Sequence, residues 1–128
     1  MEVRDAVEGD AEALADMADG PRDVLRNLIH DRTVRIAIED DDPVAFVSFD
    51  ARPGTVYVTQ IGGEPVACGR LLEEPVRFAR REGMDVELLV ADGEEAIREA
   101  VTGSGFEEVG PGPRFEGVPT VRYRRDPE

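Results

Sequence analysis

Few side chains in this sequence are suited to catalysis or metal binding, apart from its many carboxylates. The chain has one Cys (Cys68), one His (His30) and two Tyr (Tyr57 and Tyr123). A lone Cys and a lone His that are far apart lack the ligand spacing of a zinc site, so no metal is expected. His30 follows a predicted helical stripe near its C-terminus, where it is interpreted as a partner of the helix dipole. The single Cys allows no intramolecular disulfide, which favours a cytoplasmic location.

The carboxylates outnumber every other kind of polar group. Asp and Glu total 29 against 15 basic residues, for a formal net charge of -14. With so many acids, a pair of carboxylates says little about acid or base catalysis. Glu39, Glu64 and Glu87 occupy strand or loop positions that a cleft would use, but we interpret them as solvated surface acids. Such a surface repels phosphate backbones and anionic lipid, which disfavours nucleic acid and membranes as partners.

All 15 basic residues are Arg and none is Lys. This composition is typical of proteins from extreme halophiles. At molar salt the Debye length falls to about 3 Å, which screens the self-repulsion of an acidic chain. A high-GC genome that replaces Lys with Arg is the alternative explanation. We therefore expect a halophilic protein.

The elements that must position these residues fit one domain over residues 1–128. With 41% hydrophobic residues the chain can bury a core. Apolar residues recur with a period of 3.6 in some segments and of two in others, and Gly and Pro separate them. The predicted helices cover 10–20, 21–29, 71–83 and 93–100, and the predicted strands cover 1–6, 33–39, 44–49, 55–61, 86–90, 106–109 and 118–124.

The element order and three phrases resemble the GCN5-related N-acetyltransferase (GNAT) superfamily. LLEEPVRFARREGMDVELLV (71–90) is similar to its third helix and fifth strand, GSGFEEVG (103–110) to the turn before its sixth strand, and VRDAVEGDAEALADMA (3–18) to its first strand and helix. The resemblance implies an α/β fold with a mixed, mostly antiparallel sheet of six or seven strands. It also implies a V-shaped split between strands 4 and 5 and about four helices.

The resemblance further implies acetyl transfer from acetyl-CoA to an amine. In that family the backbone of strand 4 pairs with the pantetheine arm, here at Gln60 and Ile61, and amides at the start of the third helix bind the pyrophosphate. The family signature at that helix is Gln/Arg-x-x-Gly-x-Gly/Ala. In this sequence its key positions fall on Gly63, Val66 and Cys68, or, shifted by one residue, on Glu64, Ala67 and Gly69.

Neither register supplies the basic or amide side chain of the signature. Arg70, at the predicted start of the third helix, is the candidate replacement for a phosphate contact, and an ion pair with Glu73 or Glu74 is its alternative role. The predicted cofactor-binding residues are Gln60, Ile61, Cys68, Gly69 and Arg70.

The catalytic Tyr of the family would fall on Val101, five residues before Phe106. This leaves Tyr57 and Tyr123 as candidates for a proton donor. Two functions stay open: acetyl-CoA-dependent transfer to a small amine or peptide, and a catalytically inactive module that binds a ligand or a protein. Either function is compatible with a monomer or a homodimer.

Overall fold

The computed structural model describes residues 1–18, 20–114 and 117–126. In these residues seven strands form one sheet in the order β1-β2-β3-β4-β5-β7-β6. All neighbouring strands are antiparallel except β4 and β5, which are parallel. The strands are β1 (Glu2–Asp5), β2 (Thr33–Glu39), β3 (Asp42–Arg52), β4 (Thr55–Gly63), β5 (Asp85–Ala91), β6 (Glu107–Pro111) and β7 (Thr120–Arg125). The helices are a 3-10 turn (Glu8–Asp10), α1 (Ala11–Ala18), α2 (Arg22–Asp31), α3 (Pro65–Leu71), α4 (Glu73–Glu82) and α5 (Glu95–Gly103).

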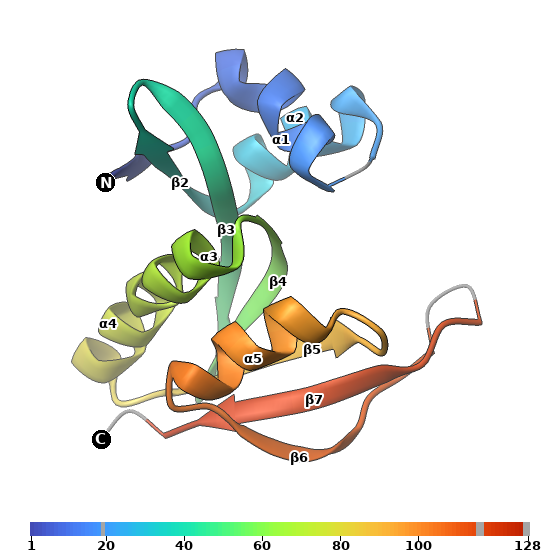
Figure 1. Cartoon of the computed structure of the whole chain (residues 1–128). Coiled ribbons are helices and arrows are strands. Elements are labelled where there is room, and N and C mark those ends of the chain that lie inside the picture. Colours follow the sequence, from blue (N-terminus) through green and yellow to red (C-terminus); the bar gives the residue numbers. More distant parts are fainter. Residues whose placement is uncertain (19, 115–116, 127–128) are drawn as a thin grey trace.

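Helices cover both faces of the sheet and define two cores. On one face, α1 and α2 pack Leu14 and Leu25 against Phe46 of β3. On the other face, α3, α4 and α5 form a larger core that includes Leu71 and Val101. Figure 1 shows α1 and α2 together at one end of the molecule and α5 lying along β5 and β7 at the other. No helix in the described ranges is long and apolar enough to cross a membrane.

The order of elements predicted from the sequence is confirmed, with one change at the third helix. The predicted helix 71–83 corresponds to α4 (Glu73–Glu82), and an additional helix, α3 (Pro65–Leu71), precedes it where a loop was expected. Pro75 lies in the first turn of α4, where its missing N–H costs no helical hydrogen bond. Gly83 ends α4 with a φ of 69°, the left-handed conformation that glycine adopts most easily at a helix end.

Asp10 ends the 3-10 turn that precedes α1. Its carboxylate accepts hydrogen bonds from Arg4 Nη1 (2.8 Å), Arg4 Nη2 (3.0 Å) and the N–H of Val7 (2.8 Å). These bonds, with Arg4 as the main cause, hold the pKa of Asp10 below its usual value. Asp10 therefore ties β1 to the turn that leads into α1.

Candidate functional site

Strands β4 and β5 run side by side only at their first residues. Their parallel pairing joins Thr55 to Asp85 and ends at Val58 and Leu88. Beyond that pair, β4 continues to Gly63 against β3, and β5 continues to Ala91 against β7. Figure 1 shows the two strands diverging. This split leaves backbone groups along the inner edge of β4 turned towards a partner other than β5.

A β-bulge in β4 lies at the start of the split. The register between β3 and β4 shifts between Ser48 and Phe49, which pair with Gln60 and Val58, so Thr59 is the extra residue. The hydroxyls of Thr59 and Ser48 are 2.6 Å apart and share a hydrogen bond. A bulge bends a strand and changes the direction of its side chains, and here it does so where β4 leaves β5.

Two adjoining cavities open at the split. The first, which we call the mouth cavity, has a volume of about 320 Å³ and lies between the end of α1 and the start of α5. The second, the face cavity, has a volume of about 750 Å³ and is bounded by β4, β5, β7 and the segment that precedes β7. Both are lined by Gln60, Leu89 and Ala91. A ligand that passes between the diverging strands would therefore contact both cavities.

The face cavity combines apolar walls with polar side chains that include Tyr57, Glu87 and Arg122. Tyr57 is 39% exposed and is the register partner of Glu87, which is 6% exposed. Arg122 donates a hydrogen bond to Oε1 of Glu87, and Nη1 of Arg124 lies 3.5 Å from Oε2. The charge of the buried carboxylate is thus balanced by two guanidinium groups, which allows Glu87 to be buried.

The structure places two of the predicted cofactor-binding residues at the split. Gln60 and Ile61 line the mouth cavity, and Gln60 also reaches the face cavity. Both belong to the part of β4 that β5 leaves unpaired.

The other three, Cys68, Gly69 and Arg70, do not line it. They were expected at the start of the third helix, but α3 begins at Pro65, so they lie in its later turns. Cys68 is fully buried, and burial raises the pKa of its thiol to about 11. The carbonyl of Gly69 accepts a long hydrogen bond from the hydroxyl of Ser104 (3.4 Å) beside α5. Arg70 Nη1 donates to Glu73 Oε2 at 2.7 Å, which confirms the ion pair considered as its alternative role.

The two tyrosines have different surroundings. Tyr57 lines the face cavity. Tyr123 is 2% exposed in the core under α5, and its hydroxyl accepts a hydrogen bond from Arg98 Nε at 2.9 Å. Tyr57 is therefore the candidate that a ligand at the split can reach.

Glu87 is the site residue whose role the sequence analysis underestimated. Glu39 and Glu64 are exposed, as expected for surface acids. Glu87 is buried and lines the face cavity. The available signal was its position as the single acid within the apolar strand 86–90, since a carboxylate is seldom placed there without a buried partner. In the described part of the chain, no cluster of His, Cys, Asp and Glu could hold a metal ion.

Comparison with known proteins identifies the fold. No protein-family model matches the sequence, and no curated protein matches it. A protein from Desulfovibrio desulfuricans assigned to the GNAT family of acetyltransferases superposes with a TM-score of 0.79, at 19% identity over 99% of both chains. The ribosomal-protein-S18-alanine N-acetyltransferase of Escherichia coli superposes with a TM-score of 0.78, at 12% identity over 98% of this chain and 92% of its own.

A third structure, from Salmonella typhimurium, contains its cofactor acetyl-CoA. It gives a TM-score of 0.78 at 16% identity, over 100% of this chain and 94% of its own. The chain has the GNAT fold, and the resemblance seen in its sequence is confirmed at the level of the fold.

The cofactor of that fold fits this site only in part. The open edge of β4 and the apolar side chains among those that line the mouth cavity, such as Met17 and Ile61, suit the uncharged pantetheine arm. At the start of α3, where a diphosphate would lie, the chain has Glu64 and then Pro65. A carboxylate repels phosphate and a proline has no N–H to donate, so this position does not fit the diphosphate.

Proposed function

We propose that this protein is an N-acetyltransferase that uses the split between β4 and β5. The donor, an acetyl thioester such as acetyl-CoA, lies with its pantetheine arm along Gln60 and Ile61. The acceptor amine lies in the face cavity. The observation that carries this proposal is that the mouth and face cavities adjoin at Gln60, Leu89 and Ala91. The fold, shared with acetyltransferases, supports it.

When bound, the thioester supplies an acetyl group, which exchanges its bond to sulfur for one to the amine nitrogen, while the amine proton replaces it on sulfur. The chain's own contribution is to position both molecules and to limit access of water. Tyr57 is the side chain in the face cavity that is suited to pass a proton to a leaving thiolate. Glu87, held by Arg122 and Arg124, organises the base of the cavity rather than acting as a free base.

The face cavity supports a small amine or the end of a peptide as the acceptor. Its volume of about 750 Å³ lies within the range of ordinary small-molecule sites. Pro113 and Val118 give it an apolar rim, and Tyr57 and Arg122 place polar groups inside it.

The proposal is tested by following thiol release from acetyl-CoA and from acetyl-pantetheine with a panel of amines and peptides in molar KCl. Ala91, which lines both cavities, is replaced by Phe to obstruct their junction. We expect Ala91→Phe to lower the rate by about a hundredfold, because small displacements of reacting groups have effects of that size. Ala96→Phe adds the same side chain at an exposed position of α5 and serves as the control. Wild-type protein that is inactive with every donor and amine contradicts the proposal.

A second candidate function is a module that binds a ligand or a protein without catalysis. The absence of a phosphate-binding loop before α3, where Glu64 and Pro65 stand instead, favours it. The two functions are distinguished by comparing binding with turnover. Binding at the split without acetyl transfer to any acceptor supports the module, and transfer excludes it.

A further inference from the structure

The connection between β4 and α3 leaves only two backbone donors for a phosphate. β4 ends at Gly63 and α3 begins at Pro65, with Glu64 as the N-cap. The first four N–H groups of a helix normally lack helical partners and are free to bind an anion. Here the N–H of Glu64 donates to the carbonyl of Val44 at 2.9 Å, and Pro65 has none. The regular helical bonds begin with the N–H of Cys68, which donates to the carbonyl of Glu64 at 2.8 Å, so the amides of Val66 and Ala67 are the two that remain.

This connection is also held tightly in place. Gly63 has a φ of 114°, and a Cβ at this position would overlap the carbonyl oxygen of Val44 and the backbone of Ala45. The backbone of β4 is therefore pressed against β3 where a phosphate-binding loop would need to bulge outwards. The glycine is required for this close approach.

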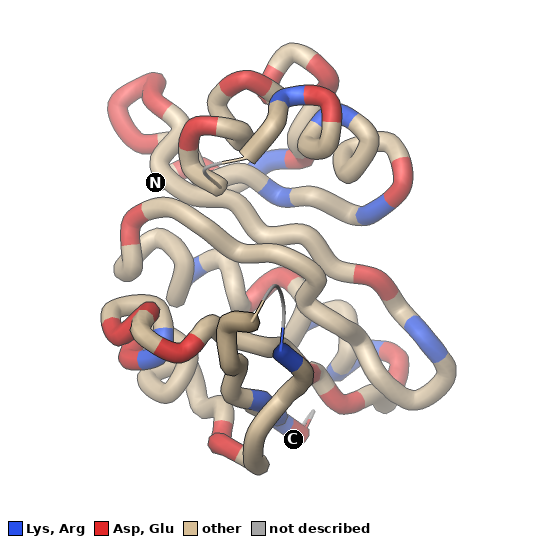
Figure 2. Tube along the Cα trace, turned by 90° about the vertical axis from the view of Figure 1, so that its right-hand side faces the viewer, with Lys and Arg blue, Asp and Glu red and all other residues tan. Residues whose placement is uncertain are grey.

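The charges around the mouth cavity also disfavour a bound phosphate. Glu94 lines the cavity, Glu95 begins α5, and no Arg lines it among the described residues. Two arginines on the neighbouring helices α3 and α5 are already in ion pairs: Arg70 with Glu73 at 2.7 Å, and Arg98 with Glu95 at 3.3 Å. Figure 2 shows acidic positions near both ends of the molecule, interspersed with basic ones. An anion at the mouth would meet repulsion without a charged donor to offset it.

What remains at the split suits an uncharged chain with amide groups. The edge of β4 past Val58 presents N–H and C=O groups, as a strand edge does to an added strand. Met17, Ile61 and Ile97 provide apolar contacts in the mouth cavity. The pantetheine arm of a thioester has this chemistry, with two amides and no charge, and it occurs both in coenzyme A and on carrier proteins.

We propose that this protein recognises its acyl donor through the pantetheine arm alone and derives no affinity from the donor's phosphates. The inference rests on the proposed use of the split by an acetyl thioester. It predicts that donors without the nucleotide bind as well as acetyl-CoA. In a GNAT-fold protein with a phosphate-binding loop, removal of the nucleotide removes several charge-assisted hydrogen bonds. Such a protein is expected to bind acetyl-CoA more tightly than a donor without the nucleotide.

The test is a binding series in molar KCl that uses S-acetyl-pantetheine, S-acetyl-4′-phosphopantetheine and acetyl-CoA, measured by calorimetry or amide shifts and independent of turnover. We expect the three dissociation constants to agree within about threefold, a difference of about 0.7 kcal/mol. Lowering the salt should weaken the binding of acetyl-CoA and leave the binding of S-acetyl-pantetheine unchanged, because only acetyl-CoA carries negative charge that the acidic site repels. Acetyl-CoA binding more than about tenfold tighter than S-acetyl-pantetheine overturns the inference and leaves the proposed function standing.

The remaining outcomes separate the two proposals. Equal binding of all three donors without acetyl transfer supports the inference and contradicts the enzyme. If no donor binds at millimolar concentration, both are overturned. The binding series also distinguishes coenzyme A from a carrier protein as the source of the pantetheine arm. A carrier-specific protein would bind S-acetyl-4′-phosphopantetheine on its carrier far better than any of the free donors.

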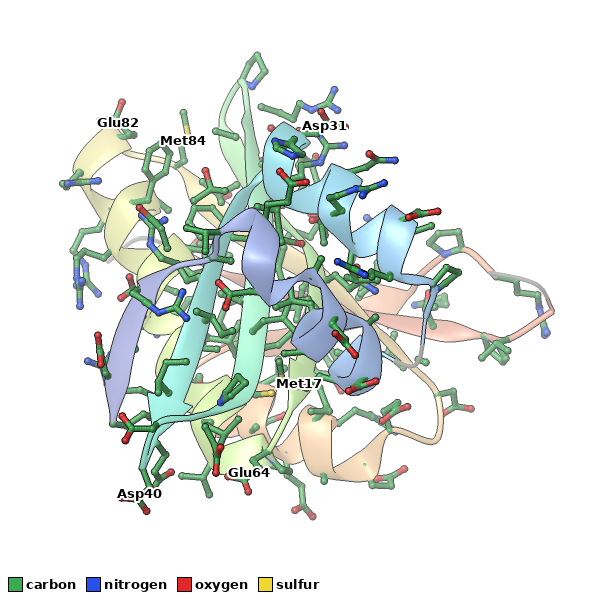
Figure 3. All side chains as sticks on the ribbon, turned by 90° about the horizontal axis from the view of Figure 1, so that it is seen from above. Met17, Asp31, Asp40, Glu64, Glu82 and Met84 are labelled. Atoms are coloured by element: carbon green, nitrogen blue, oxygen red, sulfur yellow. The ribbon has the colours of Figure 1, made fainter. Side chains whose placement is uncertain are left out.

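Variants of two exposed acids test the role of Glu64 itself. Figure 3 shows Glu64 and Glu82 on opposite sides of the molecule. Glu64→Arg supplies the missing charged donor. It should tighten the binding of acetyl-CoA by about tenfold and leave the binding of S-acetyl-pantetheine unchanged. Glu82→Arg makes the same change in net charge at the far end of α4 and should have little effect on either. If Glu64→Arg leaves acetyl-CoA unchanged, or Glu82→Arg acts equally, the repulsion does not come from Glu64.

Discussion

Tyr57 and Glu87 are register partners on the parallel strands β4 and β5, one pair before these strands separate at Val58 and Leu88. Their side chains share the base of the face cavity. This places a phenol next to a carboxylate whose oxygens are already held by Arg122 and Arg124. Under the proposed function, the phenol is therefore the group that exchanges a proton with a ligand at the split.

Replacing each tyrosine with phenylalanine should have opposite consequences for activity and stability. We expect Tyr57→Phe to lower kcat by about a hundredfold with little change in KM, since the loss of a general acid has effects of that order. Tyr123→Phe should leave kcat unchanged and lower the free energy of unfolding by about 1 kcal/mol, because it removes the hydrogen bond from Arg98. Steady-state kinetics and urea unfolding check both. Equal kinetic effects of the two changes would refute this assignment.

Asp10 should stabilise the protein in a pH-dependent way. Its pKa in the folded state lies below the ordinary value of 3.8, chiefly because of its hydrogen bonds with Arg4. Its contribution is therefore complete above that ordinary value and is lost as the pH falls through the lower, folded-state pKa. We expect Asp10→Asn to cost about 1–2 kcal/mol at neutral pH. The difference from wild type should shrink in acid.

The control for this change is Asp16→Asn, which removes the same charge from an exposed position of α1. Urea unfolding of both variants at neutral and acidic pH provides the measurement. A cost for Asp10→Asn that is independent of pH would mean that the carboxylate charge is not responsible.

Cys68 should be chemically inert while the protein is folded. Its thiol is fully buried in α3, and burial raises its pKa to about 11, so little thiolate forms near neutral pH. A thiol reagent such as 5,5′-dithiobis(2-nitrobenzoate) should react slowly with the native protein and at once in urea. Addition of an acetyl donor should not change the native rate. Rapid reaction that the donor blocks would instead place Cys68 at the binding site.

Stability should increase with salt. The net charge of -14 is spread over acidic segments throughout the chain, and its self-repulsion is screened at molar ionic strength. We expect the melting temperature to rise by on the order of 10 °C between millimolar and molar KCl, equivalent to about 2 kcal/mol for a domain of this size. Calorimetry over this range checks the expectation. An unchanged melting temperature would remove the halophilic interpretation.

The sequence was sufficient to predict the fold because its local patterns give an order of elements that resembles the GNAT family. The alternation of apolar residues at 33–39 defines β2, and Gly83 ends α4 as predicted. The start of α3 was misplaced because the double leucine at 71–72 was held in the family register. Pro65, which suits the first position of a helix, was the local signal for the true start.

The chemistry of the face cavity could not be predicted from local patterns. Glu87 is buried because Arg122, 35 positions away in sequence, reaches it from β7. That contact depends on β7 pairing next to β5 although β6 precedes it in the chain. Likewise, the cavities form only where β4 and β5 diverge, which is a property of the assembled sheet.

The most direct test of the account is an amide chemical-shift titration with S-acetyl-pantetheine in molar KCl. The account predicts shifts at Gln60, Ile61 and Gly62 on β4 and at Leu89 and Ala91 on β5. It predicts none at Thr55 or Asp85, where the two strands are still paired. No shifts up to millimolar ligand, or shifts confined to residues away from the split, would contradict the claim that the diverging strands form the binding site.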